Sequence, residues 1–236
     1  MRTVCCVARD GATREHGPMS SSANLSVAHP LPAGEFSAWL RGMRRALAGG
    51  PGMEVACGSC VGCCTSSYFI KVRPHETAAL SHIAPELRRV APGEPEGTWF
   101  MGYDTQGHCP MFTAGGCSIY PHRPETCRTY DCRIFTAAGV NAGAGRNMIN
   151  ERVARWRFDY ASDDARREHR AVNAAASFLR QHPVRFPGGY VPSRPADIAV
   201  LAIKAYPVFM DEPASDAEAA AGIVAACRAF DRSGAE

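Results

Sequence analysis

The sequence predicts a mostly α-helical protein with a small, irregular α+β region that is rich in cysteine and packs with an alanine-rich helical C-terminal part. Three observations predict this class. Apolar residues recur at helical spacing near the start of the chain and through its last third. A few short β-prone segments lie between these stretches. Eight of the 11 cysteines fall between Cys57 and Cys132, whereas residues 133–226 contain none.

The size and charge of the chain exclude several classes of protein. Its 236 residues, 46% of them hydrophobic, suffice for one large domain or two small ones. The formal net charge of +3 is too small to indicate nucleic acid as a partner. The longest aliphatic run, residues 198–203, is far shorter than the ~20 residues of a membrane span. The first residues lack the apolar stretch of a secretory signal. We therefore expect a cytoplasmic protein that binds neither nucleic acid nor membranes, with an unknown protein or small-molecule partner.

Residues 1–31 are expected to form a disordered leader. Gly, Ser, Ala, Pro and His dominate there, and no periodicity is present. Met19 is an alternative start of the chain, and in that case Cys5 and Cys6 do not belong to the mature protein.

A first domain, which bears the cysteine cluster, is predicted over residues 32–136. Apolar residues at helical spacing predict a helix over 36–47, and Gly49-Gly50-Pro51 ends it. β-prone residues predict two short strands, with a helix between them that begins at a proline. These strands are expected over 68–72 and 98–103, and the helix from Pro74 to about residue 83. Residues 104–132 are rich in loops, with a short helix entered at Arg123-Pro124.

The remaining residues, 137–236, are predicted to form a helical region that packs on the first domain. Glycines at 139, 143 and 145 indicate a flexible connector. Helices are expected from Ser162 to just before His182 and again after Pro195. A last helix opens at Ser215, with Glu218 at the spacing of a capping box. Ile149, Val153 and Trp156 are predicted to share one helix face.

The cysteines themselves carry the chemistry. The first block is Cys57-Gly-Ser-Cys60-Val-Gly-Cys63-Cys64, in which a two-residue gap lets a tight turn direct two thiolates at one metal. Repeating the gap provides a third thiolate, and three thiolates from one loop with one remote cysteine are typical of cubane iron–sulfur clusters. Zinc sites more often show two separated CxxC pairs. The adjacent Cys64 binds a second metal or faces the core.

The second block supplies the remote thiols. Prolines and paired glycines turn the chain between its four cysteines. Cys127 is expected on the short helix and Cys132 just past its end. The predicted metal ligands are thus Cys57, Cys60, Cys63, Cys64, Cys109, Cys117, Cys127 and Cys132.

Basic residues near both blocks favour a metal, because cations offset the negative charge of clustered thiolates and lower thiol pKa values. They are Lys71, Arg73, Arg123, Arg128 and Arg133. The alternative is that these side chains lie on solvated surface. Two further alternatives concern the thiols, namely disulfide redox chemistry and inert burial. Burial suits Cys64 or Cys227 better than the Gly- and Ser-flanked Cys57, Cys60 and Cys63.

Other motifs are weaker. His108 and His122 lie beside the second block and are candidate ligands, although solvated histidines are more common. The segment Gly143-Ala-Gly145 lacks the third glycine of a dinucleotide-binding loop. The arginines of residues 152–170 alternate with acidic residues, which indicates a solvated helix face. A Gly-x-Ser-x-Gly nucleophile elbow is absent from the sequence.

Four stretches resemble the CxxCxxCC family of YkgJ-type zinc- or iron-chelating proteins. They are Cys57–Cys64, Cys109-Pro110, Gly116–Tyr120 and Arg123–Cys132. The resemblance covers about the middle third of the chain and implies metal binding by the clustered cysteines, with zinc and iron both open. Some relatives are lysine N-methylases that act on flagellin, and others are labelled iron–sulfur oxidoreductases. The chain has no recognisable nucleotide or S-adenosylmethionine motif, and residues 133–236 match no functional motif.

Two main hypotheses follow, and whether the protein is an enzyme stays open. In the first, slightly favoured, the cysteines hold an iron–sulfur cluster or zinc that serves as a redox centre or as an auxiliary centre for a modification reaction. In the second, zinc is structural, and the helices present a surface to a partner. A lysine N-methylase-like enzyme is a further alternative, which the resemblance alone implies.

Overall fold

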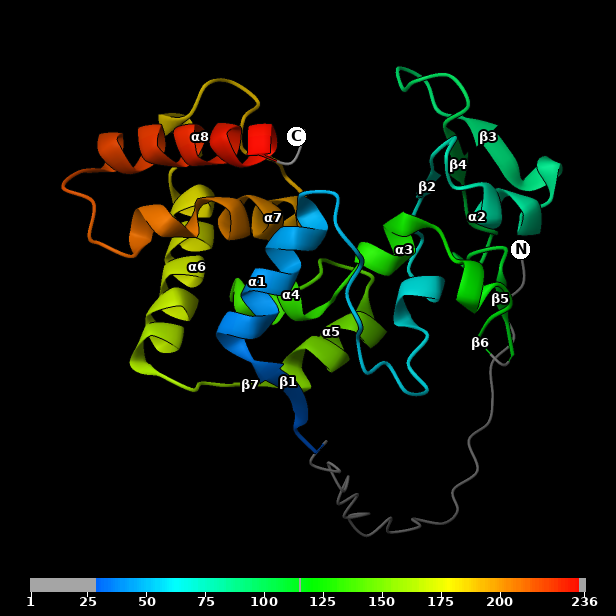
Figure 1. Cartoon of the computed structure of the whole chain (residues 1–236), viewed down its shortest axis with the longest axis horizontal. Helices are drawn as coiled ribbons and strands as arrows, with labels where there is room; N and C mark the ends of the chain where they lie inside the picture. The colour runs from blue at the N-terminus through cyan, green and yellow to red at the C-terminus, as the bar shows by residue number, and fades with distance from the viewer. Residues whose placement is uncertain (1–28, 115, 234–236) are drawn as a thin grey trace, which may run out of the picture.

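The structure is a computed structural model that describes residues 29–114 and 116–233. Its eight α-helices and three small sheets, counted over that part of the chain, confirm the predicted mostly-α class with an irregular α+β region. The long helices lie together on one side of the molecule, and the short strands and helices of the cysteine-rich region lie on the other (Figure 1). Cys5, Cys6 and nearly all of the predicted leader fall outside the described residues.

The helical side is built around one large core. Buried side chains from α1 and the C-terminal helices meet there, among them Phe36, Leu40, Val172, Ile203 and Ile223. Within the described residues, no helix is both long enough and apolar enough to cross a membrane. The helices of this side are α1 (Phe36–Leu47), α4 (Arg133–Ala137), α5 (Asn147–Arg155), α6 (Asp163–Gln181), α7 (Pro195–Ala205) and α8 (Asp216–Ser233), with 3-10 turns η4 (Pro183–Arg185) and η5 (Tyr206–Phe209).

Two strands that are far apart in the sequence pair on this side of the molecule. β1 (Leu31–Glu35) pairs in parallel with β7 (Trp156–Asp159), beginning with Leu31 opposite Trp156. The cysteine-rich region therefore leaves the helical side after α1 and returns to it before β7. α1 packs against α6 and α7, so the large core joins the beginning of the chain to its end. The predicted domain boundary at residues 136/137 stays a prediction.

The cysteine-rich side has a second, much smaller core. It consists of Ile70, Val72, Ala79, Ile83, Met101, Met111 and Ile119. Strands of two or three residues provide little stability by themselves. The elements are η1 (Gly62–Thr65), β2 (Ile70–Val72), α2 (Thr77–His82), η2 (Pro85–Leu87), β3 (Arg88–Val90), β4 (Trp99–Met101), β5 (Phe112–Thr113), β6 (Gly116–Cys117), η3 (Tyr120–His122) and α3 (Glu125–Thr129). The antiparallel sheet has the order β2-β4-β3, and β5 pairs with β6.

Most predicted elements are found, with two corrections. α2 begins at Thr77 rather than at Pro74, because the Glu76 carboxylate accepts a hydrogen bond from the backbone N–H of Arg73 and holds a turn before the helix. Trp156 does not continue the helix face of Ile149 and Val153, because it begins β7 by pairing with Leu31.

Gly52, which precedes the cysteine motif, lets the chain pass close to the backbone of α3. A Cβ on Gly52 would lie 2.5 Å from the carbonyl oxygen of Arg128, and the next residue, Met53, donates its N–H to that same oxygen at 2.8 Å. We expect Gly52→Ala to lower the free energy of unfolding by about 1–3 kcal/mol, as measured by urea denaturation. Gly188→Ala is the control, because a Cβ there meets no atom within 4 Å. Equal stabilities of the two variants would contradict the close approach.

A half-buried histidine makes stability pH-dependent. His169 stacks on Phe36 with ring centroids 4.3 Å apart and is hydrogen-bonded to the Tyr160 hydroxyl. Burial lowers the pKa of His169 in the folded protein. The unfolded chain therefore binds the proton more readily as the pH falls below about 6.5. The free energy of unfolding should decrease from pH 7.5 to 5.5 in urea titrations, and less so in His169→Phe. Parallel curves for the two proteins would refute this contribution.

Candidate metal centre

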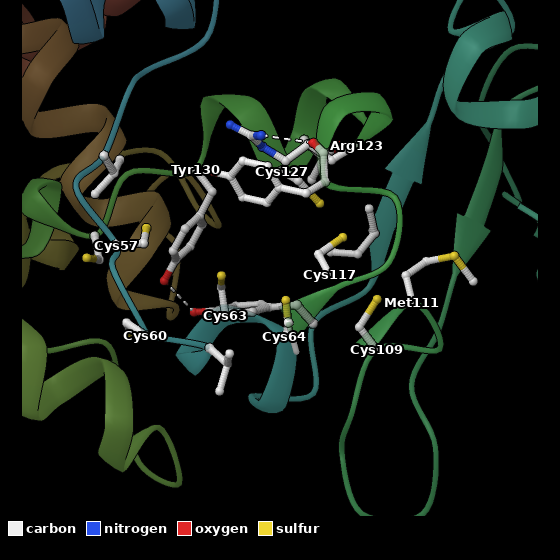
Figure 2. A pocket seen from close by; sticks show the side chains of 18 of the residues that line it. Cys57, Cys60, Cys63, Cys64, Cys109, Met111, Cys117, Arg123, Cys127 and Tyr130 are labelled. Carbon is white, nitrogen blue, oxygen red and sulfur yellow. Dashed lines mark hydrogen bonds between the residues drawn. The ribbon is translucent and has the colours of Figure 1, made fainter. Parts of the chain in front are cut away.

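All eight predicted cysteines line one cavity of about 620 Å³. The cavity lies where the cysteine-rich side meets α5, and its walls also carry apolar and aromatic side chains such as Tyr68, Met111 and Ile149. Each of the eight has a free thiol. Figure 2 shows the thiols of both sequence blocks around this one space.

The first block forms a tight loop against α5. Cys60 donates its N–H to the carbonyl oxygen of Cys57 at 3.0 Å, and Cys64 donates to that of Val61 at 2.9 Å. A Cβ on Gly62 would lie 3.1 Å from the Ile149 side chain. The glycine therefore lets the loop approach α5 closely. Arg152, also on α5, donates to the carbonyl oxygen of Ala56, just before the first cysteine.

The second block meets the first directly. Cys109 donates its N–H to the carbonyl oxygen of Cys64 at 2.7 Å. Cys117 lies at the end of β6, Cys127 on α3 and Cys132 at the N-terminus of α4. Cys127 is thus on the short helix and Cys132 past its end, as predicted. The assignment of all eight residues as metal ligands stays a prediction, but the structure brings their loops together.

The thiols differ in how readily they lose a proton. Burial raises the pKa of Cys57 and Cys109, and it raises those of Cys127 and Cys132 to about 12. A hydrogen bond from the Cys64 thiol lowers the pKa of Cys63 to about 7, and the same bond raises the pKa of Cys64. A metal ion that binds here therefore has to displace protons from buried thiols.

Only one of the five predicted cations reaches the cavity. Arg123 lines it, with its guanidinium 4.0 Å from the centroid of the Tyr120 ring. Lys71 and Arg73 pair with glutamates, Arg128 donates to the carbonyl oxygen of Arg123, and Arg133 donates to the carbonyl oxygens of Ala33 and Glu54. Arg152 lines the cavity as well. The sequence placed Arg152 on a solvated helix face, and no signal short of the tertiary structure distinguishes it from its neighbours.

The two candidate histidines do not line the cavity. His108 faces Asp104, with Nδ1 3.9 Å from a carboxylate oxygen. His122 stacks on His82, with ring centroids 4.0 Å apart. The described lining residues thus present eight cysteine thiols to the cavity and include no histidine, aspartate or glutamate.

A buried polar network supports Cys132. The preceding residue, Asp131, accepts hydrogen bonds from the Trp39 indole at 2.8 Å and from the Arg133 guanidinium at 2.7–3.0 Å. The Trp156 indole donates to the Cys132 sulfur at 3.2 Å. Of these residues the sequence indicated only Arg133, because the Trp39–Asp131 and Trp156–Cys132 contacts join residues 92 and 24 positions apart in the chain.

The donor set fits a thiophilic metal. Cysteine thiolates bind zinc and iron–sulfur clusters, whereas magnesium and calcium prefer oxygen. Over residues 29–114 and 116–233, no three Cys, His, Asp or Glu side chains already stand in a geometry that holds an ion.

Trp156 is expected to tune any iron–sulfur centre at Cys132. Trp156→Phe removes the N–H···S hydrogen bond, and loss of such a bond makes the reduction potential more negative. Spectroelectrochemical titration of the reduced and oxidised protein measures the shift. Trp39→Phe is the matched control, because its indole donates to Asp131 instead of sulfur. A potential that moves equally in both variants would argue against this role.

The fold gathers eight cysteine thiols around one cavity, which is the arrangement expected of a metal-chelating cysteine-cluster protein. Residues 56–151 match the model of the CxxCxxCC family, whose description is "Putative zinc- or iron-chelating domain". This match confirms, over residues 56–151, the resemblance seen in the sequence, and it supports metal binding. No curated protein and no solved structure gave a significant match to the chain.

Proposed function

We propose that the clustered cysteines hold an iron–sulfur centre that serves in electron transfer or supports a modification reaction. One observation carries the proposal. Eight thiols line a single cavity whose described walls offer no carboxylate or imidazole. An iron–sulfur cluster, when bound, supplies one-electron redox chemistry whose potential depends on hydrogen bonds to sulfur, net charge and exposure to solvent.

The surrounding residues support such a centre in three ways. Arg123 and Arg152 place positive charge at the cavity, which offsets the charge of several thiolates. The Trp156 indole orients the Cys132 sulfur. Apolar side chains such as Ile70, Met101 and Ile149 limit the entry of water.

Structural zinc is the second candidate function. The small core of the cysteine-rich side favours it, since seven residues bury too little apolar surface to stabilise that side without a further constraint. In this case the metal supplies folding free energy, and the cavity has no redox role. For either metal we place the protein in the cytoplasm, because a reducing compartment keeps free thiols available.

Metal analysis of protein purified without oxygen tests the proposal. We expect a brown protein that contains iron and acid-labile sulfide, with visible absorption that bleaches on reduction. Cys227→Ser is the matched control, because Cys227 is buried on α8 outside the cavity and its replacement should leave the spectrum unchanged. A colourless protein with stoichiometric zinc would favour the structural function instead.

A further inference from the structure

We infer that the eight thiols form two separate four-thiolate metal centres within the one cavity. Cys57, Cys60, Cys63 and Cys132 form the centre beside α5 and β7, and Cys64, Cys109, Cys117 and Cys127 form the centre beside the three-stranded sheet. The inference rests on the proposed function, in that the cysteines must bind metal at all. It adds which thiols act together and how many centres the chain holds.

The second centre is built onto the small core. Cys109, Cys117 and Cys127 all pack against that core, which includes Met111 and Ile119. The hydrogen bond from the N–H of Cys109 to the carbonyl oxygen of Cys64 attaches the fourth residue to the same place. These four cysteines come from η1, the β5–β6 region and α3, which are the elements of the cysteine-rich side.

The first centre is built onto the large core instead. Cys132 packs against the large core and accepts the hydrogen bond from Trp156. The Cys57–Cys60 turn is held to α5 by Arg152.

A pair of tyrosines stands between Cys57 of the first set and two members of the second set, Cys117 and Cys127. The hydroxyls of Tyr68 and Tyr130 are 3.1 Å apart, and their ring centroids are separated by 5.4 Å. In Figure 2, Tyr130 lies between Cys57 on one side and Cys117 and Cys127 on the other. The guanidinium of Arg146 lies 4.5 Å from the centroid of the ring of Tyr68, the other member of the pair. A single metal shell that joins Cys57 to Cys117 and Cys127 would have to displace this pair.

Cys63 and Cys64 mark the place where the two centres approach each other. Both lie on η1, and successive residues of a 3-10 helix are turned by about 120°, so neighbouring side chains can serve different sites. The two residues are adjacent in the chain, which places the two centres close together at this point. Each centre then has four thiolates, which suits a closed zinc site or a cubane cluster.

Counting metal centres in the intact protein tests the inference. Native mass spectrometry and metal analysis are applied to the full chain and to two double variants, Cys57→Ser/Cys60→Ser and Cys109→Ser/Cys117→Ser. We expect two equal metal centres per wild-type chain and a loss of half of the metal in each variant. Cys227→Ser should retain both centres.

The outcomes separate the inference from the function on which it rests. One centre per wild-type chain, or one larger cluster, would overturn the inference while leaving metal binding intact, and this result does not depend on how the variants fold. Complete loss of metal in either folded double variant would also overturn it, with folding checked by circular dichroism. Wild-type protein without metal would overturn the proposed function and the inference together.

Discussion

Removal of the metal should unfold the cysteine-rich side of the molecule while the helical side stays folded. The two sides have separate cores, and the smaller one contains only seven buried residues. Structural metal binding contributes about 10–16 kcal/mol in small zinc domains, far more than strands of two or three residues provide. The large core joins α1 to α6, α7 and α8 and does not need the metal.

Hydrogen–deuterium exchange with and without a chelator measures this effect. Amides of β2, β4 and α3 should lose protection when the metal is removed, whereas amides of α6 and α7 should keep it. The β1–β7 pair provides an internal reference, because it joins the ends of the large core. Uniform loss of protection across the chain would show that the two cores unfold as one unit, and unchanged protection would show that the metal is not structural.

Replacing Asp131 with asparagine should cost roughly 3 kcal/mol of stability or more. The Asp131 side chain is fully buried, and the guanidinium of Arg133 that it binds is only 12% exposed. Asparagine removes the negative charge and leaves this cation without its partner in a site of low dielectric. The Trp39 indole also loses a charged acceptor. Urea denaturation of the metal-loaded protein measures the loss.

A surface pair provides the control for this prediction. Asp231 binds Lys204 at 2.6 Å but is 62% exposed, and exposed pairs contribute between 0 and about 1 kcal/mol. Asp231→Asn should therefore change stability much less than Asp131→Asn. Because Asp131 precedes a predicted ligand, Asp131→Asn should also weaken metal retention at Cys132 during dialysis. Similar stability losses in the two variants would contradict the importance of the buried network.

The sequence predicts the helices well, because apolar spacing and capping residues that lie close together in the chain determine where they form. The apolar spacing of residues 36–47 and the Ser162 cap define α1 and α6. The CxxCxxCC motif indicates metal chemistry because its short gaps let several thiolates of one loop point at the same metal. The start of α2 was predicted wrongly, because the turn that precedes it depends on the Glu76 carboxylate.

The long-range features could not be predicted from a single sequence. The parallel pairing of β1 with β7 brings together residues more than 120 positions apart. That pairing makes Trp156 a strand residue and allows its indole to reach the Cys132 sulfur. Arg152 shares the alternating charge pattern of its neighbours, and only the packing of α5 against the first cysteine loop distinguishes it.

X-ray absorption at the metal edge of protein purified without oxygen tests the central claim most directly. If sulfur atoms from both cysteine blocks bind the metal, its first shell should contain sulfur alone, at about 2.3 Å for zinc or with the iron–sulfur and iron–iron scattering of a cluster. A first shell of oxygen or nitrogen would contradict the account. So would a sulfur shell that stays unchanged in a quadruple variant in which Cys57, Cys60, Cys109 and Cys117 are replaced by serine.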